Sequence, residues 1–458
     1  TWAPYFDFTG VQLTWMLVGY GFVAAVLPVW LLLAPRDYLS TFLKIGTIVG
    51  LAIGILIMRP TLTMPALTKF IDGTGPVWTG NLFPFLFITI ACGAVSGFHA
   101  LIASGTTPKM LANENQACFI GYGGMLMESF VAIMALVSAC IIDPGVYFAM
   151  NSPMAVLAPA GTADVVASAA QVVSGWGFAI TPETLTHIAN EVGEQSIISR
   201  AGGAPTLAVG MAYILHGALG GLMDVSFWYH FAILFEALFI LTAVDAGTRA
   251  ARFMLQDLLG VISPGLKRTD SLPANLLATA LCVLAWGYFL HQGVVDPLGG
   301  INTLWPLFGI ANQMLAGMAL MLCAVVLFKM KRQRYAWVAL VPTAWLLICT
   351  LTAGWQKAFS PDTKIGFLAI ANKFQAMIDS GNIPAQYTQS QLSQLVFNNR
   401  LDAGLTIFFM VVVVVLAWFS LKTALAALKV DTPTAKETPY EPMPENLDEI
   451  VTQAKGAH

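Results

Sequence analysis

Charged residues are scarce in this chain of 458 residues. Asp, Glu, Lys and Arg make up 10% of it, whereas soluble domains carry about 25% charged residues. Hydrophobic residues make up 57%, and the mean hydropathy is +0.73. A water-soluble globule could not hide this much apolar surface, because its outside must face water. A lipid bilayer removes that requirement, so the composition indicates an integral membrane protein in contact with the bilayer.

Other absences narrow the function. The net charge of −3 provides no basic footprint for a nucleic acid, so we expect none as a partner. The six cysteines fall in apolar stretches without metal-type spacing, which indicates packing and no bound metal. The sequence offers no Gly-rich phosphate loop or nucleophile elbow in a suitable context. We therefore expect neither a cofactor nor an enzyme. His216 and His230, on either side of Asp224, are the one weak hint of an intramembrane enzyme.

The beginning of the chain lacks an initiator Met and the basic region of a signal peptide. It starts at Thr1 in what reads as a short extramembrane loop. We therefore expect the chain to be a fragment of a longer protein.

Long apolar runs predict an all-α, polytopic bundle of about ten membrane-spanning helices over residues 1–428, since a span needs around 20 mostly apolar residues. Polar insertions at 143–205 and 355–402 interrupt the bundle, and a polar tail follows at 429–458. The candidate spans are Val11–Ala34, Phe42–Met58, Leu82–Ser104, Cys118–Ile142, Thr206–Met223, Val225–Gly247, Ala274–Leu290, Ile301–Phe328, Tyr335–Gly354 and Leu405–Leu428.

Basic residues predict the orientation, because Lys and Arg gather in cytoplasmic loops. One predicted cytoplasmic loop holds Arg249, Arg252, Lys267 and Arg268, and another holds Lys329, Lys331, Arg332 and Arg334. This arrangement requires an odd number of crossings between Pro205 and Thr248. Either Thr206–Met223 is broken or re-entrant, which we favour, or part of Met154–Phe178 crosses the membrane. The C-terminal tail is then cytoplasmic.

Ionisable side chains at membrane depth are costly and therefore point to function. Glu128 and Glu236 lie deep in predicted spans and are expected to be the best-buried carboxylates. Such a group can take up and release a proton near neutral pH, as proton coupling requires. A structural hydrogen bond or ion pair is the alternative. Asp245 lies nearer a helix end with Arg249 one turn away, which favours an interfacial ion pair.

Three segments have the composition of discontinuous helices, which transporters use to bind substrates and ions near the membrane midplane. Close packing of helices through small residues is the alternative reading. The candidate substrate-binding residues in these segments are Gly19, Tyr20 and Gly21 ahead of Pro28; Ser96, Gly97, His99, Thr106 and Thr107 ahead of Pro108; and Asn312 and Gln313 after Pro306.

Five stretches of this sequence closely resemble the carbon starvation protein A family, and the likeness runs essentially end to end. They are 91–109 (ACGAVSGFHALIASGTTPK), 121–129 (GYGGMLMES), 199–206 (SRAGGAPT), 245–249 (DAGTR) and 304–313 (LWPLFGIANQ). The resemblance points to an enteric-bacterial member of the family.

The resemblance implies an inner-membrane carrier induced when carbon runs short, importing peptides, or pyruvate by proton symport. It also implies the inverted-repeat fold of the amino acid–polyamine–organocation superfamily, and several more helices ahead of Thr1. Expected partners are therefore protons and pyruvate or short peptides. A starvation sensor or scaffold without transport activity is the alternative from another class.

Overall fold

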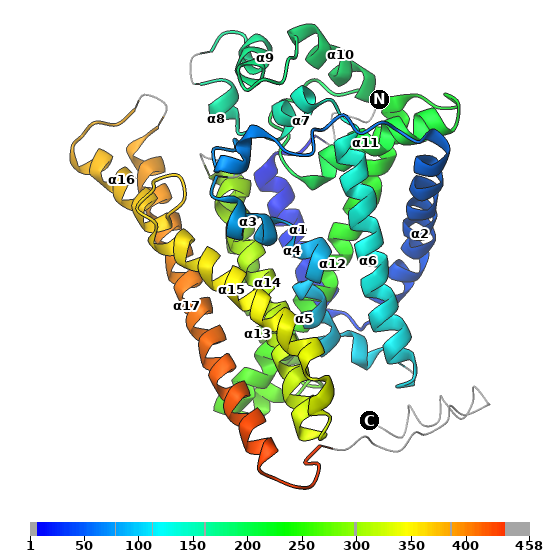
Figure 1. Cartoon of the computed structure of the whole chain (residues 1–458), viewed down its shortest axis with the longest axis vertical. Coiled ribbons are helices and arrows are strands. Elements are labelled where there is room, and N and C mark those ends of the chain that lie inside the picture. Colours follow the sequence, from blue (N-terminus) through cyan, green and yellow to red (C-terminus); the bar gives the residue numbers. More distant parts are fainter. Residues whose placement is uncertain are drawn as a thin grey trace.

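The computed structural model describes residues 7–77, 79–111, 113–159, 162–296, 300–384 and 387–435. The regular elements of these residues are all helices, as the predicted all-α class requires (Figure 1). The helices that carry the argument are α1 (Gly10–Val26), α2 (Leu33–Met58), α3 (Leu82–Thr89), α4 (Ala91–Val95), α5 (Gly97–Gly105), α6 (Gln116–Cys140), α7 (Pro144–Asn151), α8 (Met154–Leu157), α9 (Val165–Gly175), α10 (Pro182–Val192), α11 (Gly203–Ala218), α12 (Val225–Ile262), α13 (Leu272–Val295), α14 (Gly300–Lys329), α15 (Trp337–Phe359), α16 (Phe367–Asp379) and α17 (Gln389–Leu428).

Seven of the described helices are long and apolar enough to cross a membrane: α2, α6, α12, α13, α14, α15 and α17. The shorter apolar helix α1 packs on α12 and α13. The interrupted run α3–α5 packs on α14. The chain is therefore a multi-pass membrane protein.

The first two helices differ from the predicted spans. The predicted span Val11–Ala34 is wrong at its end, because α1 stops at Val26. Pro28 explains the stop, since a proline pushes the residue before it out of the helical region, and Leu27 is extended at φ −64° and ψ 149°. The chain turns there, and α2 begins at Leu33, ahead of the predicted start at Phe42.

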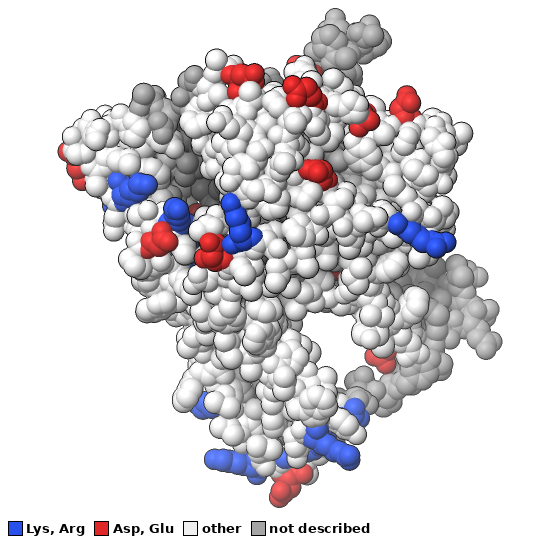
Figure 2. Space-filling model, turned by 45° about the horizontal axis from the view of Figure 1, so that its top comes forward, with Lys and Arg blue, Asp and Glu red and all other residues white. Residues whose placement is uncertain are grey.

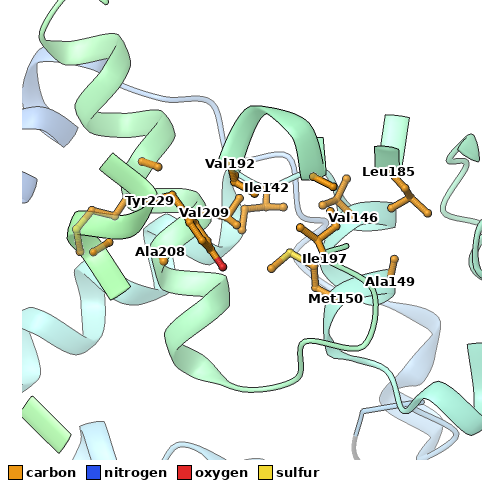
Figure 3. Packing of buried hydrophobic residues seen from close by; sticks show 14 of the residues in the cluster. Ile142, Val146, Ala149, Met150, Leu185, Val192, Ile197, Ala208, Val209 and Tyr229 are labelled. Atoms are coloured by element: carbon orange, nitrogen blue, oxygen red, sulfur yellow. The ribbon is translucent and has the colours of Figure 1, made fainter. Parts of the chain in front are cut away.

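The insertion 143–205 folds into a cap at one end of the bundle, made of α7 to α10 (Figure 1). Its buried residues merge with those of α11 and the first turns of α12. Figure 3 shows Val146 and Met150 of the cap close to Ala208, Val209 and Tyr229 of these two helices. Because α9 packs on α7 and α10 inside this cap, the structure does not support a membrane crossing by Met154–Phe178.

Helix α11 is short for a membrane span. Its 16 residues span about 24 Å, which is less than the roughly 30 Å of a hydrocarbon core. It begins beside the cap, where the Gly202 N–H donates to Asn151 Oδ1. The chain then returns to the cap, where Gly193 lies against Ser226 of α12. The broken or re-entrant crossing favoured in the sequence analysis stays a prediction.

The insertion 355–402 is more helical than expected. Helix α15 continues through its first residues to Phe359, and α17 includes its last residues and runs unbroken for 40 residues. A capping box formed by Thr388 and Gln391 fixes the start of α17. The polar residues up to Asp402 therefore belong to the same helix as the apolar span that follows.

The two ends of the molecule differ in charge. Acidic residues are spread over the cap end, whereas a group of basic residues lies at the opposite end, where the loops after α12 and α14 turn (Figure 2). The basic residues of these turns are Lys267, Arg268, Lys329, Lys331, Arg332 and Arg334.

Candidate functional site

The predicted span Leu82–Ser104 is broken at Ser96. Ser96 is in the left-handed conformation, with φ 46° and ψ 57°, and it separates α4 from α5. A non-glycine residue in this conformation is uncommon and strained, and such strain is concentrated at functional sites. The structure thus contains the discontinuous helix that the glycines and hydroxyls of this segment predict.

Helix α14 holds the broken ends in place. The backbone N–H of Phe98, in the first turn of α5, donates to Asn312 Oδ1 at 2.7 Å. The two backbones touch at Gly97, where an added Cβ would overlap the Asn312 carbonyl oxygen and lie 2.9 Å from the Ala316 nitrogen. Only glycine fits this contact, so Gly97 allows α5 to pack directly against the backbone of α14 at Asn312.

Polar groups without partners lie at the break. Ser96 and Asn312 are 2% and 3% exposed, yet Ser96 Oγ and Asn312 Nδ2 have no nitrogen or oxygen partner among the described residues. The sulfur of Cys92, a weak acceptor, lies beside both, and Glu128 Oε1 is 4.0 Å from it. Buried polar groups are normally hydrogen-bonded, so this arrangement can accept a polar ligand.

The other predicted binding residues of this region differ in burial and in their hydrogen-bond partners. Gln313 is buried and already bonded, since its Oε1 accepts from Thr350 Oγ1 at 3.2 Å. Thr106 is buried and its hydroxyl lies 3.4 Å from the Ala246 carbonyl. Thr107 is half-buried after the end of α5, and the side chain of His99 is exposed. The structure brings Ser96, Gly97 and Asn312 together, and His99 is not among them.

A second centre surrounds Asp245, which is fully buried in α12. Arg36 of α2 approaches Asp245 Oδ2 at 3.3 Å, and Arg249 approaches Oδ1 at 3.8 Å. Arg36 also donates to the hydroxyl of Tyr20 on α1. The predicted pair of Asp245 and Arg249 exists, but the expected interfacial position is wrong, because the pair lies inside the bundle.

The predicted loop position of Arg249 and Arg252 is also wrong. They are 2% and 5% exposed within α12. Arg249 Nη2 donates to the carbonyls of Ala24 and Leu27, and Arg252 Nη1 donates to that of Ala25. These carbonyls are left without helical partners because α1 stops before Pro28. The two arginines therefore bind the open end of α1.

This charged centre carries more positive than negative charge. Its described cations are Arg36, Lys44, Arg249 and Arg252, and its described acids are Asp37 and Asp245. Buried charges are stable only when they are compensated, so the excess favours an anionic ligand.

Helix α5 connects the two centres. Its N-terminal end contacts Asn312 of α14, and its C-terminal end lies against α12, where a Cβ on Gly105 would be 2.9 Å from that of Ala250. Phe98 also packs against Gly247 of α12. A displacement of α5 would therefore change the contacts at both centres.

The remaining predicted residues lie elsewhere. Helix α1 is continuous at Gly19 and Gly21: Gly19 faces open space, and Gly21 packs against Trp286. Of the predicted segment, only Tyr20 reaches the charged centre. The side chains of Pro306 and Lys109 lie outside the described residues.

The expectation that Glu128 and Glu236 are the best-buried carboxylates is wrong. Both are half-buried, whereas Asp245, Asp296 and Asp402 are at least nine-tenths buried. The sequence analysis missed the last two because Asp296 lies in the connection between two predicted spans and Asp402 ends a predicted polar insertion.

The two histidines that hinted at an enzyme do not form a pair. His216 Nδ1 contacts the Met223 carbonyl, and His230 Nδ1 contacts the Ser226 carbonyl, each at 2.8 Å. Each ring therefore has a local backbone partner within its own segment.

Comparison with known proteins gives one family. The family model described as "Carbon starvation protein CstA" matches residues 1–353. The peptide transporter CstA of Escherichia coli K12 is 94% identical over 458 residues, covering all of this chain and 65% of that protein. The pyruvate/proton symporter BtsT of the same strain is 58% identical over 462 residues, covering 97% of this chain and 64% of that protein.

A more distant relative, the peptide transporter CstA of Mycobacterium tuberculosis H37Rv, is 52% identical over 420 residues, covering 90% of this chain and 55% of that protein. The chain thus spans about two thirds or less of the length of these curated relatives. No solved structure matches it.

Proposed function

Since the chain belongs to the carbon starvation protein CstA family, we propose that it forms most of a secondary active transporter of the bacterial inner membrane. The transporter imports a small carboxylate or a short peptide together with protons. The relatives named above as a peptide transporter and as a pyruvate/proton symporter support both cargo classes.

The observation that carries this proposal is the broken helix at Ser96. Irregular backbone at membrane depth is tolerated only where it is buried in protein or lines a cavity. Discontinuous helices of this kind form the substrate sites of many transporters. Here the break leaves Ser96 Oγ and Asn312 Nδ2, beside the N-terminal end of α5, without nitrogen or oxygen partners among the described residues.

The shared chemistry of the two cargo classes is a carboxylate. A helix N-terminus attracts an anion, and α5 presents its N-terminus at the break. The charged centre around Asp245, with its excess of arginine, lies at the other end of the same helix. We propose that the carboxylate of the cargo binds at the break. Binding would displace α5 and so change the contacts of α5 with α12 near the charged centre.

Proton coupling requires a carboxylate that changes protonation as the site alternates between the two sides of the membrane. We propose Glu128 as the first candidate, because it lies beside Cys92 at the break. Glu236 and Asp245 are the further candidates. Asp245 lies between two arginines, Arg36 and Arg249.

The proposed orientation puts the basic turns after α12 and α14 in the cytoplasm, according to the positive-inside rule. Beyond the end of α17 the Thr434 N–H donates to the Lys329 carbonyl, beside one of these turns, so the tail that follows is then cytoplasmic and the acidic cap faces outward.

Uptake by the full-length protein in proteoliposomes tests the proposal. Labelled pyruvate would be offered under an imposed proton gradient, with unlabelled dipeptides as competitors. Accumulation that collapses with a protonophore and ignores dipeptides identifies a pyruvate/proton symporter. Accumulation of a labelled dipeptide in place of pyruvate identifies a peptide carrier. If neither accumulates, the proposed activity is wrong.

Glu128→Gln and Glu236→Gln then test the coupling acids. Loss of gradient-driven accumulation in one variant, with normal insertion into the membrane, assigns the acid. Uptake that persists in both removes these two residues from the mechanism.

A further inference from the structure

A third polar cluster, apart from the two centres above, lies where the end of α13 meets α17. Asp296 directly follows α13, and Asn398 and Asp402 are one helical turn apart on α17. Residues four apart on a helix lie on the same face. All three are buried, with exposures of 7%, 7% and 3%. Two carboxylates thus enter one small buried region.

The two acids have different partners. Asn398 Nδ2 donates to Asp296 Oδ2 at 3.1 Å. Among the described residues, the carboxylate of Asp402 receives no hydrogen bond, and its charged neighbour is Asp296. One turn toward the start of α17, Gln394 donates to Gln292 of α13 at 2.8 Å. The amides therefore hold the two helices together and leave Asp402 facing a like charge.

A small cavity adjoins Asp402. It has a volume of about 10 Å³ and is lined by Tyr288, Gln292, Asn398 and Asp402, together with neighbouring apolar groups. This is close to the smallest space that holds one water molecule. A proton could reach the pair through such a water, whereas a larger ligand would not fit.

Charged groups on the neighbouring elements do not neutralise Asp402. The other titratable groups on these elements are Cys282, Tyr288 and His291 on α13, Cys323 and Lys329 on α14, Cys349 and Lys357 on α15, Lys373 and Asp379 on α16, Tyr387 ahead of α17, and Arg400 and Lys422 on α17. Lys373 and Arg400 are exposed, and Lys357 lies over the rings of Phe85 and Phe367. Tyr387 interacts with Asp296. In the described part of the chain, Asp296 is the group that interacts with Asp402.

Two buried, ionised carboxylates at such a place would be unstable. Each would lose its favourable hydration on burial, and their like charges would repel, as in sites where two acids share one proton. Asn398 donates to Asp296 and so favours the ionised form of that acid. Asp402 is then the group that must be neutral.

We propose that Asp296 and Asp402 share one bound proton, and that this proton is exchanged with water during the transport cycle. The second half of this inference rests on the proposed function. The pair lies at the end of α13 opposite the basic turn at Lys267 and Arg268, which is the outer side in the proposed orientation. It would therefore be a proton site separate from Glu128.

The substrate-free test measures proton binding through stability. A native state that binds more protons than the unfolded chain loses stability as the pH rises. The thermal midpoint of the purified full-length protein is expected to fall as the pH is raised through neutrality, and to fall less in Asp402→Asn, which mimics the protonated acid. Asp379→Asn, an exposed acid on the adjacent α16, should behave like the unaltered protein. An equal pH dependence in Asp402→Asn and the unaltered protein overturns the shared proton.

The transport test separates coupling from binding. Exchange of labelled for unlabelled substrate at equilibrium needs no net proton movement, whereas accumulation does. Asp402→Asn is expected to lose gradient-driven accumulation of labelled pyruvate or dipeptide and to retain exchange, and Asp402→Glu is expected to recover part of the accumulation. Full accumulation by Asp402→Asn overturns the role in transport. If the unaltered protein neither accumulates nor exchanges either compound, the proposed function fails, and the stability test still decides the shared proton.

Discussion

Replacing Gly97 by Ala should separate α5 from α14 at the helix break. The added Cβ would overlap the carbonyl oxygen of Asn312 and lie 2.8 Å from its carbonyl carbon and 2.9 Å from the Ala316 nitrogen. These neighbours are backbone atoms, so no side chain can rotate away. Overpacking of this kind costs about 1–3 kcal/mol, and loss of the bond from Phe98 to Asn312 adds about 1 kcal/mol.

The assay is thermal unfolding and substrate uptake of Gly97→Ala in the full-length protein, beside Gly123→Ala. A Cβ on Gly123 meets nothing within 4 Å, so this control has the same change of residue without the clash. We expect a lower thermal midpoint and loss of uptake for Gly97→Ala only. Unchanged stability and uptake would refute the close contact between the two helices and the site built on it.

Two further predictions concern buried contacts. Arg249→Met leaves Asp245 with one cation fewer and the carbonyls of Ala24 and Leu27 without their arginine donor. Removing one partner of a buried ion pair typically costs about 3–5 kcal/mol, so we expect low yield and a lower thermal midpoint. A normal midpoint would contradict the burial of this pair. Asn151→Ala removes the amide that donates to Thr206 Oγ1 at 2.9 Å. We expect the free energy of unfolding to fall by about 1–3 kcal/mol and proteolysis of the cap to become faster. Asn190→Ala changes an exposed asparagine of the cap and is the control; equal proteolysis of the two variants would show that Asn151 does not hold the cap.

Much of the bundle could be predicted because membrane helices are dictated by length and apolarity. The predicted span Cys118–Ile142 corresponds to α6, and Ala274–Leu290 lies within α13. The break at Ser96 was also visible, since clustered glycines and hydroxyls weaken a helix. These features depend on the local sequence alone.

Features that depend on distant contacts could not be predicted in this way. Arg36 and Asp245 are far apart in the sequence, and nothing local indicates that they meet. The positive-inside rule predicts a loop position for Arg249 and Arg252, because Lys and Arg gather in cytoplasmic loops. Their burial makes sense only once α1 is seen to end with open carbonyls beside them. A buried arginine can thus signal a broken neighbouring helix.

The acids Asp296 and Asp402 illustrate the same limit. Asp296 lies in the connection between two predicted spans, and Asp402 ends a predicted polar insertion. Acids at such positions are normally exposed to solvent. The continuation of α17 through Asp402 and its packing on the end of α13 bury both. Neither fact can be derived from hydropathy.

The central claim is that the transported molecule binds at the break between α4 and α5. Cys92 is exposed and lies beside Ser96 and Asn312, so its alkylation by a maleimide reports on this site directly. The measurement uses full-length protein with Cys92 as its single cysteine, and a matched protein with only the exposed Cys323 of α14. Saturating pyruvate or dipeptide is predicted to slow the labelling of Cys92 and to leave that of Cys323 unchanged. If a compound that the protein demonstrably transports leaves the labelling of Cys92 unchanged, the binding site is elsewhere.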